Sequence, residues 1–182
     1  EIMFGLNMVV HKGKTIFVGD TSVHEYPTSE QMAEIAISTA RVVRLFGFEP
    51  KVAFVSHSTF GQPLTSRTKH IRKAVDILKE QKVDFEFDGD MQPDVALDSE
   101  YKELYPFSNI VGKANILIMP GQHSAAISYK MMKTLGDTKV IGPLLIGLGL
   151  PIEIAPLRSS TSELINLASV AAYSADIIDY KK

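Results

Sequence analysis

One arginine near the C-terminus stands directly before a run of hydroxyl side chains. Arg158 follows an apolar, extended segment and precedes Ser159, Ser160, Thr161, Ser162 and then Glu163. A guanidinium group beside hydroxyls and a helix start suits a phosphate group or a phosphorylated ligand. The alternative is an exposed arginine next to residues that only cap the helix. The residue before it, Leu157, has no polar group for chemistry, so the pattern favours binding over catalysis.

A second candidate is a polar loop that follows the buried-strand pattern at Lys51–Val55. Its hydroxyl-bearing residues and glycine are Ser56, Ser58, Thr59 and Gly61. Backbone N–H groups there, together with the start of the next helix, could hold an anion. The loop matches neither a Walker A motif nor a dinucleotide fingerprint. A capped loop without a ligand is the alternative.

Other polar residues give weaker signals for chemistry. The segment Asp88–Asp94 holds three carboxylates that could bind a divalent cation, but its spacing differs from an EF-hand and aspartate commonly stabilises turns. The histidines show no zinc-motif spacing. His57 lies between two serines, yet adjacent residues on an extended chain point in opposite directions. We therefore expect no metal site and no histidine-activated nucleophile.

Apolar periodicity predicts the elements that position these loops. We expect an N-terminal hairpin from Ile2–Val10 and Thr15–Val18, and a helix that Thr28 or Ser29 caps and Gly47 ends. The other expected helical segments are Ser66–Lys79, Pro93–Leu97, Ser99–Leu104, Ser124–Leu135 and Thr161–Ile178. The other expected strands are Lys51–Val55, Phe85–Phe87, Ala114–Met119, Val140–Ile141, Leu144–Leu148 and Pro151–Ile154.

Apolar strands that alternate with amphipathic helices indicate an α/β protein with a mainly parallel sheet covered on both faces. We predict one Rossmann-like α/β/α unit of three layers over residues 1–182. In such folds ligands bind beyond the carboxyl ends of the strands. The loops Ser56–Gln62, Asp88–Asp94 and Leu157–Thr161 are then the site candidates.

The composition excludes several classes of function. The formal net charge is −2 with both signs interspersed, which gives no reason to expect nucleic acid or an anionic membrane as a partner. The chain has no cysteine, so disulfides and thiolate chemistry are excluded, and a cytoplasmic location is expected. The sequence begins at Glu1 in a strand-like segment, so we expect a fragment of a longer chain.

Several segments together resemble the phosphotransacetylase (phosphate acetyltransferase) family, in particular the phosphotransacetylase-like C-terminal domain of bacterial NADP-dependent malic enzymes. The resemblance covers nearly the whole chain. The matching segments are Asp20-Thr21, Pro27-Thr28, Ala33–Ala36, Glu49–Ala53, Ser56–Gly61, Asp88–Leu97, Leu104–Ser108, Gly112–Pro120 and Ile141–Leu145.

The resemblance implies an isocitrate/isopropylmalate dehydrogenase-like fold in two lobes, a homodimer or larger homo-oligomer, and a coenzyme A site in the interlobe cleft. Active members carry a Ser-Arg-Gly segment and a following aspartate. Here Arg158 matches the arginine, Leu157 takes the serine position, Ser159 takes the glycine position, and Glu163 aligns best with the aspartate. A serine hydroxyl aimed at an oxyanion is worth about 3 kcal/mol of barrier, which leucine cannot supply.

We therefore expect no catalytic residue in this chain and a regulatory domain that binds acetyl-CoA or a related acyl-CoA as effector. The expected contacts are Arg158, Ser159, Ser56, Ser58, Thr59 and Gly61. An active phosphate acetyltransferase and a purely structural dimerisation module are the alternatives. NADP and a divalent metal would belong to the malic enzyme catalytic domain, which this chain does not contain, so we expect neither here.

Overall fold

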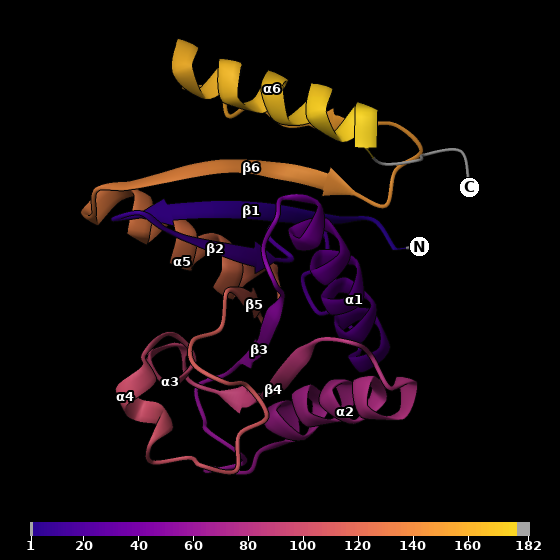
Figure 1. Ribbon diagram of the computed structural model, residues 1–182, viewed down its shortest axis with the longest axis vertical. Helices are drawn as coiled ribbons and strands as arrows, with labels where there is room; N and C mark the ends of the chain where they lie inside the picture. Colours follow the sequence, from indigo (N-terminus) through magenta and orange to yellow (C-terminus); the bar gives the residue numbers. More distant parts are fainter. Residues whose placement is uncertain (1, 178–182) are drawn as a thin grey trace.

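The structure is a computed structural model that describes residues 2–177 (Figure 1). Within that range, no helix is long and apolar enough to cross a membrane. The elements in chain order are β1 (Phe4–His11), β2 (Lys14–Gly19), α1 (Ser29–Leu45), β3 (Lys51–Val55), α2 (Ser66–Gln81), β4 (Glu86–Met91), α3 (Pro93–Leu97), α4 (Ser99–Lys102), β5 (Ile116–Ile118), α5 (Gln122–Leu135), β6 (Thr138–Ile146), β7 (Ile152–Glu153) and α6 (Thr161–Ile177).

The strands form one seven-stranded sheet in the order β4-β3-β5-β2-β1-β6-β7. The α/β class is confirmed, and the sheet is mixed, with β2, β3, β4, β5 and β6 running in one direction and β1 and β7 in the other. β2, β5, β3 and β4 pair in parallel, whereas the β1–β2 hairpin, β6 and β7 pair antiparallel. The hairpin turns β1 against its neighbours, because a short connection can join only antiparallel strands.

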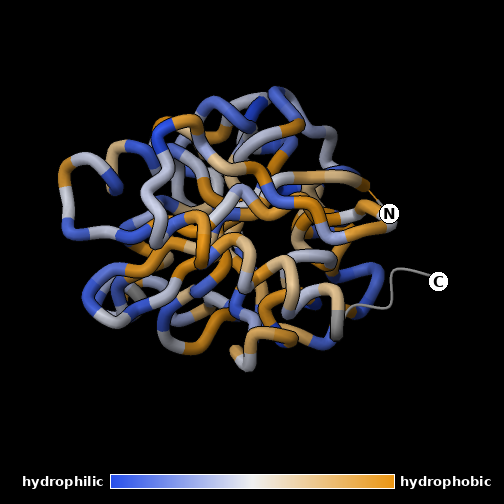
Figure 2. Tube along the Cα trace, turned by 90° about the horizontal axis from the view of Figure 1, so that it is seen from above, coloured by the Kyte–Doolittle hydropathy of each residue, from blue (hydrophilic) through white to orange (hydrophobic). Residues whose placement is uncertain are grey.

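Helices cover both faces of the sheet, which confirms the three-layer prediction (Figure 1). Successive residues of the central strands enter opposite cores, as the strand period of two requires. Val52 and Phe54 of β3 pack in the core under α1, α2 and α6, and Ala53 and Val55 pack in the core under α3 and α5. Many of the hydrophilic segments lie in peripheral loops (Figure 2).

The N-termini of the first two long helices follow from their sequences. Thr28 and Gln31 form a capping box at α1: Thr28 accepts from the Gln31 N–H at 3.2 Å, and the Gln31 side chain accepts from the Thr28 N–H at 2.8 Å. Thr65 and Thr68 form the equivalent box at α2. The predicted end of the last helix, Ile178, lies outside the described residues.

The segment around Gly142 differs from the prediction. We expected Gly142-Pro143 to separate two short strands, but β6 runs through it without a break. A bulge in the β1–β6 pairing between Leu6 and Met8 accommodates the irregularity opposite Asn7. Asn7 is fully buried, and neither polar atom of its side chain has a partner within the described residues. Its amide oxygen occupies the space where a side chain at Gly142 would point, since a built Cβ there would lie 2.3 Å away.

Glu153 on β7 makes stability depend on pH. Partial burial raises the pKa of this carboxyl to about 7, against a hydrogen bond from the backbone of Leu145 that lowers it. The native state therefore binds the proton more tightly than the unfolded chain, and stability is highest below pH about 4.5 and falls as pH rises through 7. We expect the free energy of unfolding of the wild-type chain to fall by about 1 kcal/mol between pH 5 and 8, a value reduced for the partial solvent exposure of Glu153. Glu153→Gln should abolish this fall. Urea unfolding of both proteins at the two pH values measures it, and an unchanged pH dependence would contradict it.

Candidate functional site

The loop after β3 is fastened to the end of β4 by one buried carboxylate. Asp90 is fully buried, and its side chain accepts hydrogen bonds from the Ser58 hydroxyl and from the Gly61 N–H, the latter at 3.0 Å. Its backbone carbonyl accepts from the Phe60 N–H at 2.6 Å. Because a buried carboxylate must be paired with donors, these hydrogen bonds fix the conformation of the loop against the end of β4.

The hydroxyls of this loop face inward. Ser56, Ser58 and Thr59 are all buried. Ser56 Oγ accepts from the Ser58 N–H at 3.3 Å, and Thr59 Oγ1 accepts from the Gln92 N–H at 3.2 Å. These hydroxyls therefore shape the loop, and a ligand beside it would meet mainly the main chain and the neighbouring side chains.

A cation that the sequence analysis missed lies against the same loop. A Cβ built on Gly61 would come within 2.6 Å of Nη1 of Arg72, so the glycine leaves room for this guanidinium group. Arg72 comes from the second turn of α2 and is exposed. The signal in the sequence was the basic start of α2, which has no acidic residue in its first turn.

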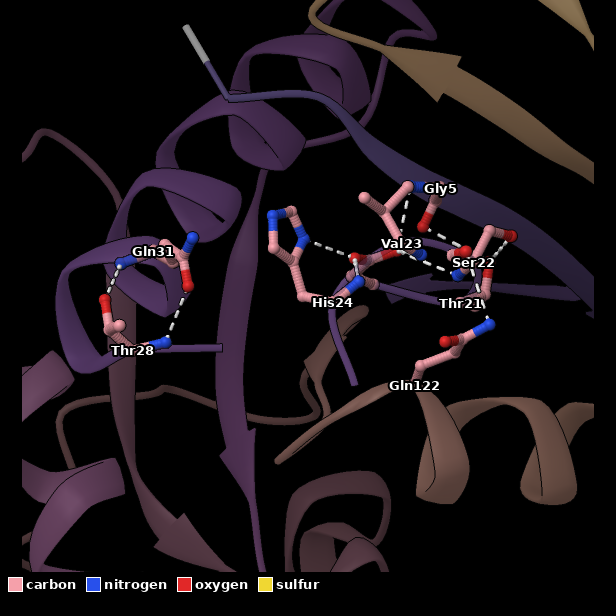
Figure 3. Close-up of polar contacts among 9 residues, drawn as sticks. Gly5, Thr21, Ser22, Val23, His24, Thr28, Gln31 and Gln122 are labelled. Carbon is pink, nitrogen blue, oxygen red and sulfur yellow. Dashed lines mark hydrogen bonds and ion pairs between the residues drawn. The ribbon is translucent and has the colours of Figure 1, made fainter. Parts of the chain in front are cut away.

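The neighbouring loop, after β2, is organised around the carboxylate of Asp20 (Figure 3). Its Oδ1 accepts from the N–H groups of Gly5, Ser22 and Val23 at 2.9, 2.9 and 3.1 Å. Its Oδ2 accepts from the N–H and the Nδ1–H of His24, both at 2.7 Å. The Gln122 side chain at the start of α5 donates to the carbonyl of Ser22 at 3.3 Å, so this network joins two loops at one edge of the sheet.

The C-terminal candidate lies at the start of α6. Leu157 is fully exposed, and Arg158 is exposed without a partner within the described residues. The hydroxyl of Ser159 is buried and has no partner there either. Ser160 and Glu163 cap α6: the N–H and Oγ of Ser160 donate to the carboxylate at 2.7 and 2.9 Å.

Glu163 is also held by a residue of α5. Nζ of Lys133 lies 2.6 Å from its Oε1. The hydrogen bond from Lys133, followed by those from Ser160, lowers the pKa of Glu163 to about 2. An efficient general base has a pKa near the working pH. Glu163 is therefore a structural carboxylate and a poor proton acceptor at neutral pH.

A groove of about 360 Å³ runs between α5, β6 and the start of α6. Its polar wall contains Lys133, Lys139, Ser160, Glu163 and Asn166. A larger groove of about 560 Å³ lies at the opposite edge of the sheet, beside Glu49, Asp84 and Phe85 at the starts of β3 and β4. Ligands of α/β folds bind at the carboxyl ends of strands, whereas the larger groove lies at the starts of β3 and β4 and the smaller groove beside the first residues of β6, which runs parallel to β2. Neither groove therefore lies at the end of the sheet where a ligand is expected.

The structure does not bring the two groups of predicted ligand residues together. The Ser56–Gly61 loop follows β3, the second strand of the sheet, whereas Arg158 and Ser159 follow β7, the seventh. Five strand spacings of about 4.8 Å place them about 24 Å apart within one chain. Figure 1 shows α2 and α6 at opposite ends of the molecule.

The aspartates of β4 and α3 accept hydrogen bonds from nearby backbone groups. Asp88 accepts from the N–H groups of Gly89 and Asn109 at 2.9 and 2.7 Å, and Asp94 accepts from the Val95 N–H at 2.9 Å. Across residues 2–177, no group of three or more carboxylate or histidine side chains could hold a metal ion. The carboxylates of this segment therefore serve turns and loops.

Solved structures define the class of this fold. A phosphotransacetylase from Streptococcus pyogenes superposes with a TM-score of 0.90 at 30% identity, over 97% of this chain and 54% of its own. A phosphotransacetylase from Staphylococcus aureus gives a TM-score of 0.86 at 27% identity, over 96% of this chain and 55% of its own. The chain has the phosphotransacetylase fold and spans about half of these proteins.

Sequence comparison places the chain within that class. The family model for phosphate acetyl/butaryl transferases matches residues 1–172, so the chain belongs to this family. It is 46% identical to an NADP-dependent malic enzyme of Rhizobium meliloti over 95% of the chain and 23% of the relative. It is 35% identical to a phosphate acetyltransferase of Clostridium acetobutylicum over 88% of the chain and 49% of the relative.

Proposed function

We propose that this chain is a regulatory and oligomerisation domain of an NADP-dependent malic enzyme, cytoplasmic, that binds acetyl-CoA or a related acyl-CoA and transfers no acetyl group. The similarity to malic enzymes supports the assignment of the parent protein as a malic enzyme. The chain spans 23% of the Rhizobium meliloti relative. NADP and the divalent metal would then be bound by other parts of that protein.

The observation that supports the absence of acetyl transfer is the low pKa of Glu163. By resemblance this carboxylate aligns best with the family's catalytic aspartate, but hydrogen bonds from Lys133 and Ser160 lower its pKa to about 2. Leu157, where the family's serine is expected, presents only an alkyl group to solvent. A chain without a proton acceptor and without the hydroxyl lacks two groups that acetyl transfer requires.

Exposed apolar side chains on α5 support self-association. Ile127, Met131 and Leu135 are spaced four residues apart, so they share one face of the helix, and they are 57, 54 and 81% exposed. A continuous apolar stripe on a helix is typical of a contact surface. An effector that prefers one arrangement of the oligomer would then regulate the catalytic domain.

Two measurements on the isolated chain test the proposal. Calorimetry with acetyl-CoA should show saturable binding, and a thiol-release assay with acetyl phosphate and CoA should show no turnover. Rapid turnover would favour an active phosphate acetyltransferase. Absence of binding at millimolar acetyl-CoA would favour a purely structural dimerisation module, which the separation of the predicted ligand residues also supports.

Arg158 provides a sharper test of the ligand. If its free guanidinium group binds an anionic group of the effector, Arg158→Ala should weaken acetyl-CoA binding by about 1.5–3 kcal/mol, the contribution of a charged hydrogen bond. That is roughly a ten- to hundredfold rise in Kd by calorimetry. Lys14→Ala, which removes the same charge from the exposed start of β2, serves as the control. An unchanged Kd for Arg158→Ala would remove this residue from the site.

A further inference from the structure

The first two turns of α2 present a surface rich in cations beside the Ser56–Gly61 loop. Four cations, Arg67, Lys69, Arg72 and Lys73, occur within seven residues without an intervening acid. All four side chains are exposed. Lys73 pairs with Glu30 of α1 at 2.6 Å and is thereby neutralised.

The other cations keep their charge available. The guanidinium group of Arg67 stacks over the exposed ring of Tyr26 at 5.3 Å, a contact that leaves its N–H donors free. Arg72 and Lys69 have no ion-pair or hydrogen-bond partner within residues 2–177. Charged side chains that have no acidic partner are the ones that can bind an external anion.

The position of Arg72 is set by the loop rather than by the helix end. The group lies against Gly61, whose φ of +82° and missing side chain allow the close approach. Gly61 is in turn fixed by its hydrogen bond to the buried Asp90. A guanidinium held against a rigid loop is well suited to phosphate, because its planar fork binds two oxygens at once.

We propose that Arg72, assisted by Lys69, which lies one turn away on the same face of α2, forms a subsite for the phosphate groups of a nucleotide-type ligand at the carboxyl end of β3. The identity of that ligand as an acyl-CoA rests on the proposed function. The subsite itself rests on the geometry around Gly61. It lies at the opposite end of the sheet from Arg158, so the same phosphate cannot contact both arginines.

Adenosine 3′,5′-bisphosphate is the probe, because it carries phosphates on a nucleoside but has no thioester. We expect calorimetry at low salt to show that Arg72→Ala raises its Kd at least about tenfold, with Arg72→Lys intermediate because lysine cannot bind bidentately. Lys14→Ala removes one charge from the exposed start of β2, at the other end of the strands, and should leave the Kd unchanged. Inorganic phosphate, titrated in the same way, distinguishes a free anion from a nucleotide. Urea unfolding verifies that each variant is folded.

The outcomes separate this inference from the proposed function. Equal Kd values for wild type and Arg72→Ala, or an equal loss in Lys14→Ala, would overturn the subsite even if acetyl-CoA binds. Binding of the bisphosphate that depends on Arg72, without any binding of acetyl-CoA, would retain the subsite and refute the proposed effector. Failure of the wild-type chain to bind either compound would refute both.

Discussion

Gly142→Ala is expected to lower the free energy of unfolding by at least about 3 kcal/mol. Gly142 has a φ of +128°, a conformation that side chains rarely adopt. A Cβ there would also lie 2.3 Å from the amide oxygen of Asn7 and 2.8 Å from the carbonyl oxygen of Leu6. Backbone strain and overpacking add at such a site, because the buried β1–β6 pair cannot move away. Urea unfolding measures the loss.

Gly149→Ala is the matched control for that experiment. Nothing lies within 4 Å of a Cβ built at Gly149, and its φ is not in the positive region. The free energy of unfolding should then change by no more than about 0.5 kcal/mol. Similar stabilities for the two variants would show that β1 and β6 can separate at the bulge, and would contradict the tight packing of Asn7 against Gly142.

Substitutions of Asp20 are expected to produce a graded loss of stability. In Asp20→Asn the oxygen retained at one position can still accept from Gly5, Ser22 and Val23, but the new amide group faces the donors of His24. We expect a loss of about 2 kcal/mol, because the backbone and ring donors of His24 lose their acceptor. Asp20→Ala leaves all of these donors without an acceptor, and its expected loss is about 4 kcal/mol.

Asp76→Asn provides the comparison for an exposed aspartate. Asp76 contacts Lys79 at 3.3 Å on the surface of α2, where an ion pair contributes little. Asp76→Asn should lower the free energy of unfolding by less than about 0.5 kcal/mol in the same urea titration. If Asp20→Asn and Asp20→Ala were equally mild, the hydrogen bonds around Asp20 would not determine the conformation of the loop after β2.

Local patterns predicted most of the fold. The hairpin, the helix cap expected at Thr28 or Ser29 and the strand at Lys51–Val55 depend on neighbours in the sequence. All three are confirmed, and the cap is Thr28. The strands predicted at Phe85–Phe87 and Val140–Ile141 are longer in the structure, because pairing with distant strands extends them. β4 continues to Met91 along β3, and β6 runs from Thr138 to Ile146 along β1.

The candidate site was less predictable than the fold. The sequence identified the loop after β3 and the start of α6, but the order of strands decides how far apart they lie, and β5, β2, β1 and β6 intervene. The partner of Glu163 comes from Lys133 on α5, a pairing that no motif indicates. Arg72 was missed for the same reason, because its contact with Gly61 exists only once α2 packs beside the loop.

The pairing of β1 with β6 links the two ends of the described chain. Phe4 lies opposite Ile146, so β1 pairs along its second edge with a strand more than a hundred residues later in the sequence. Sheets closed by such distant segments fold slowly, because a long loop must be ordered before the contact forms. Truncation before Thr138 would expose the apolar edge of β1, and an uncovered strand of this kind recruits other chains into aggregates.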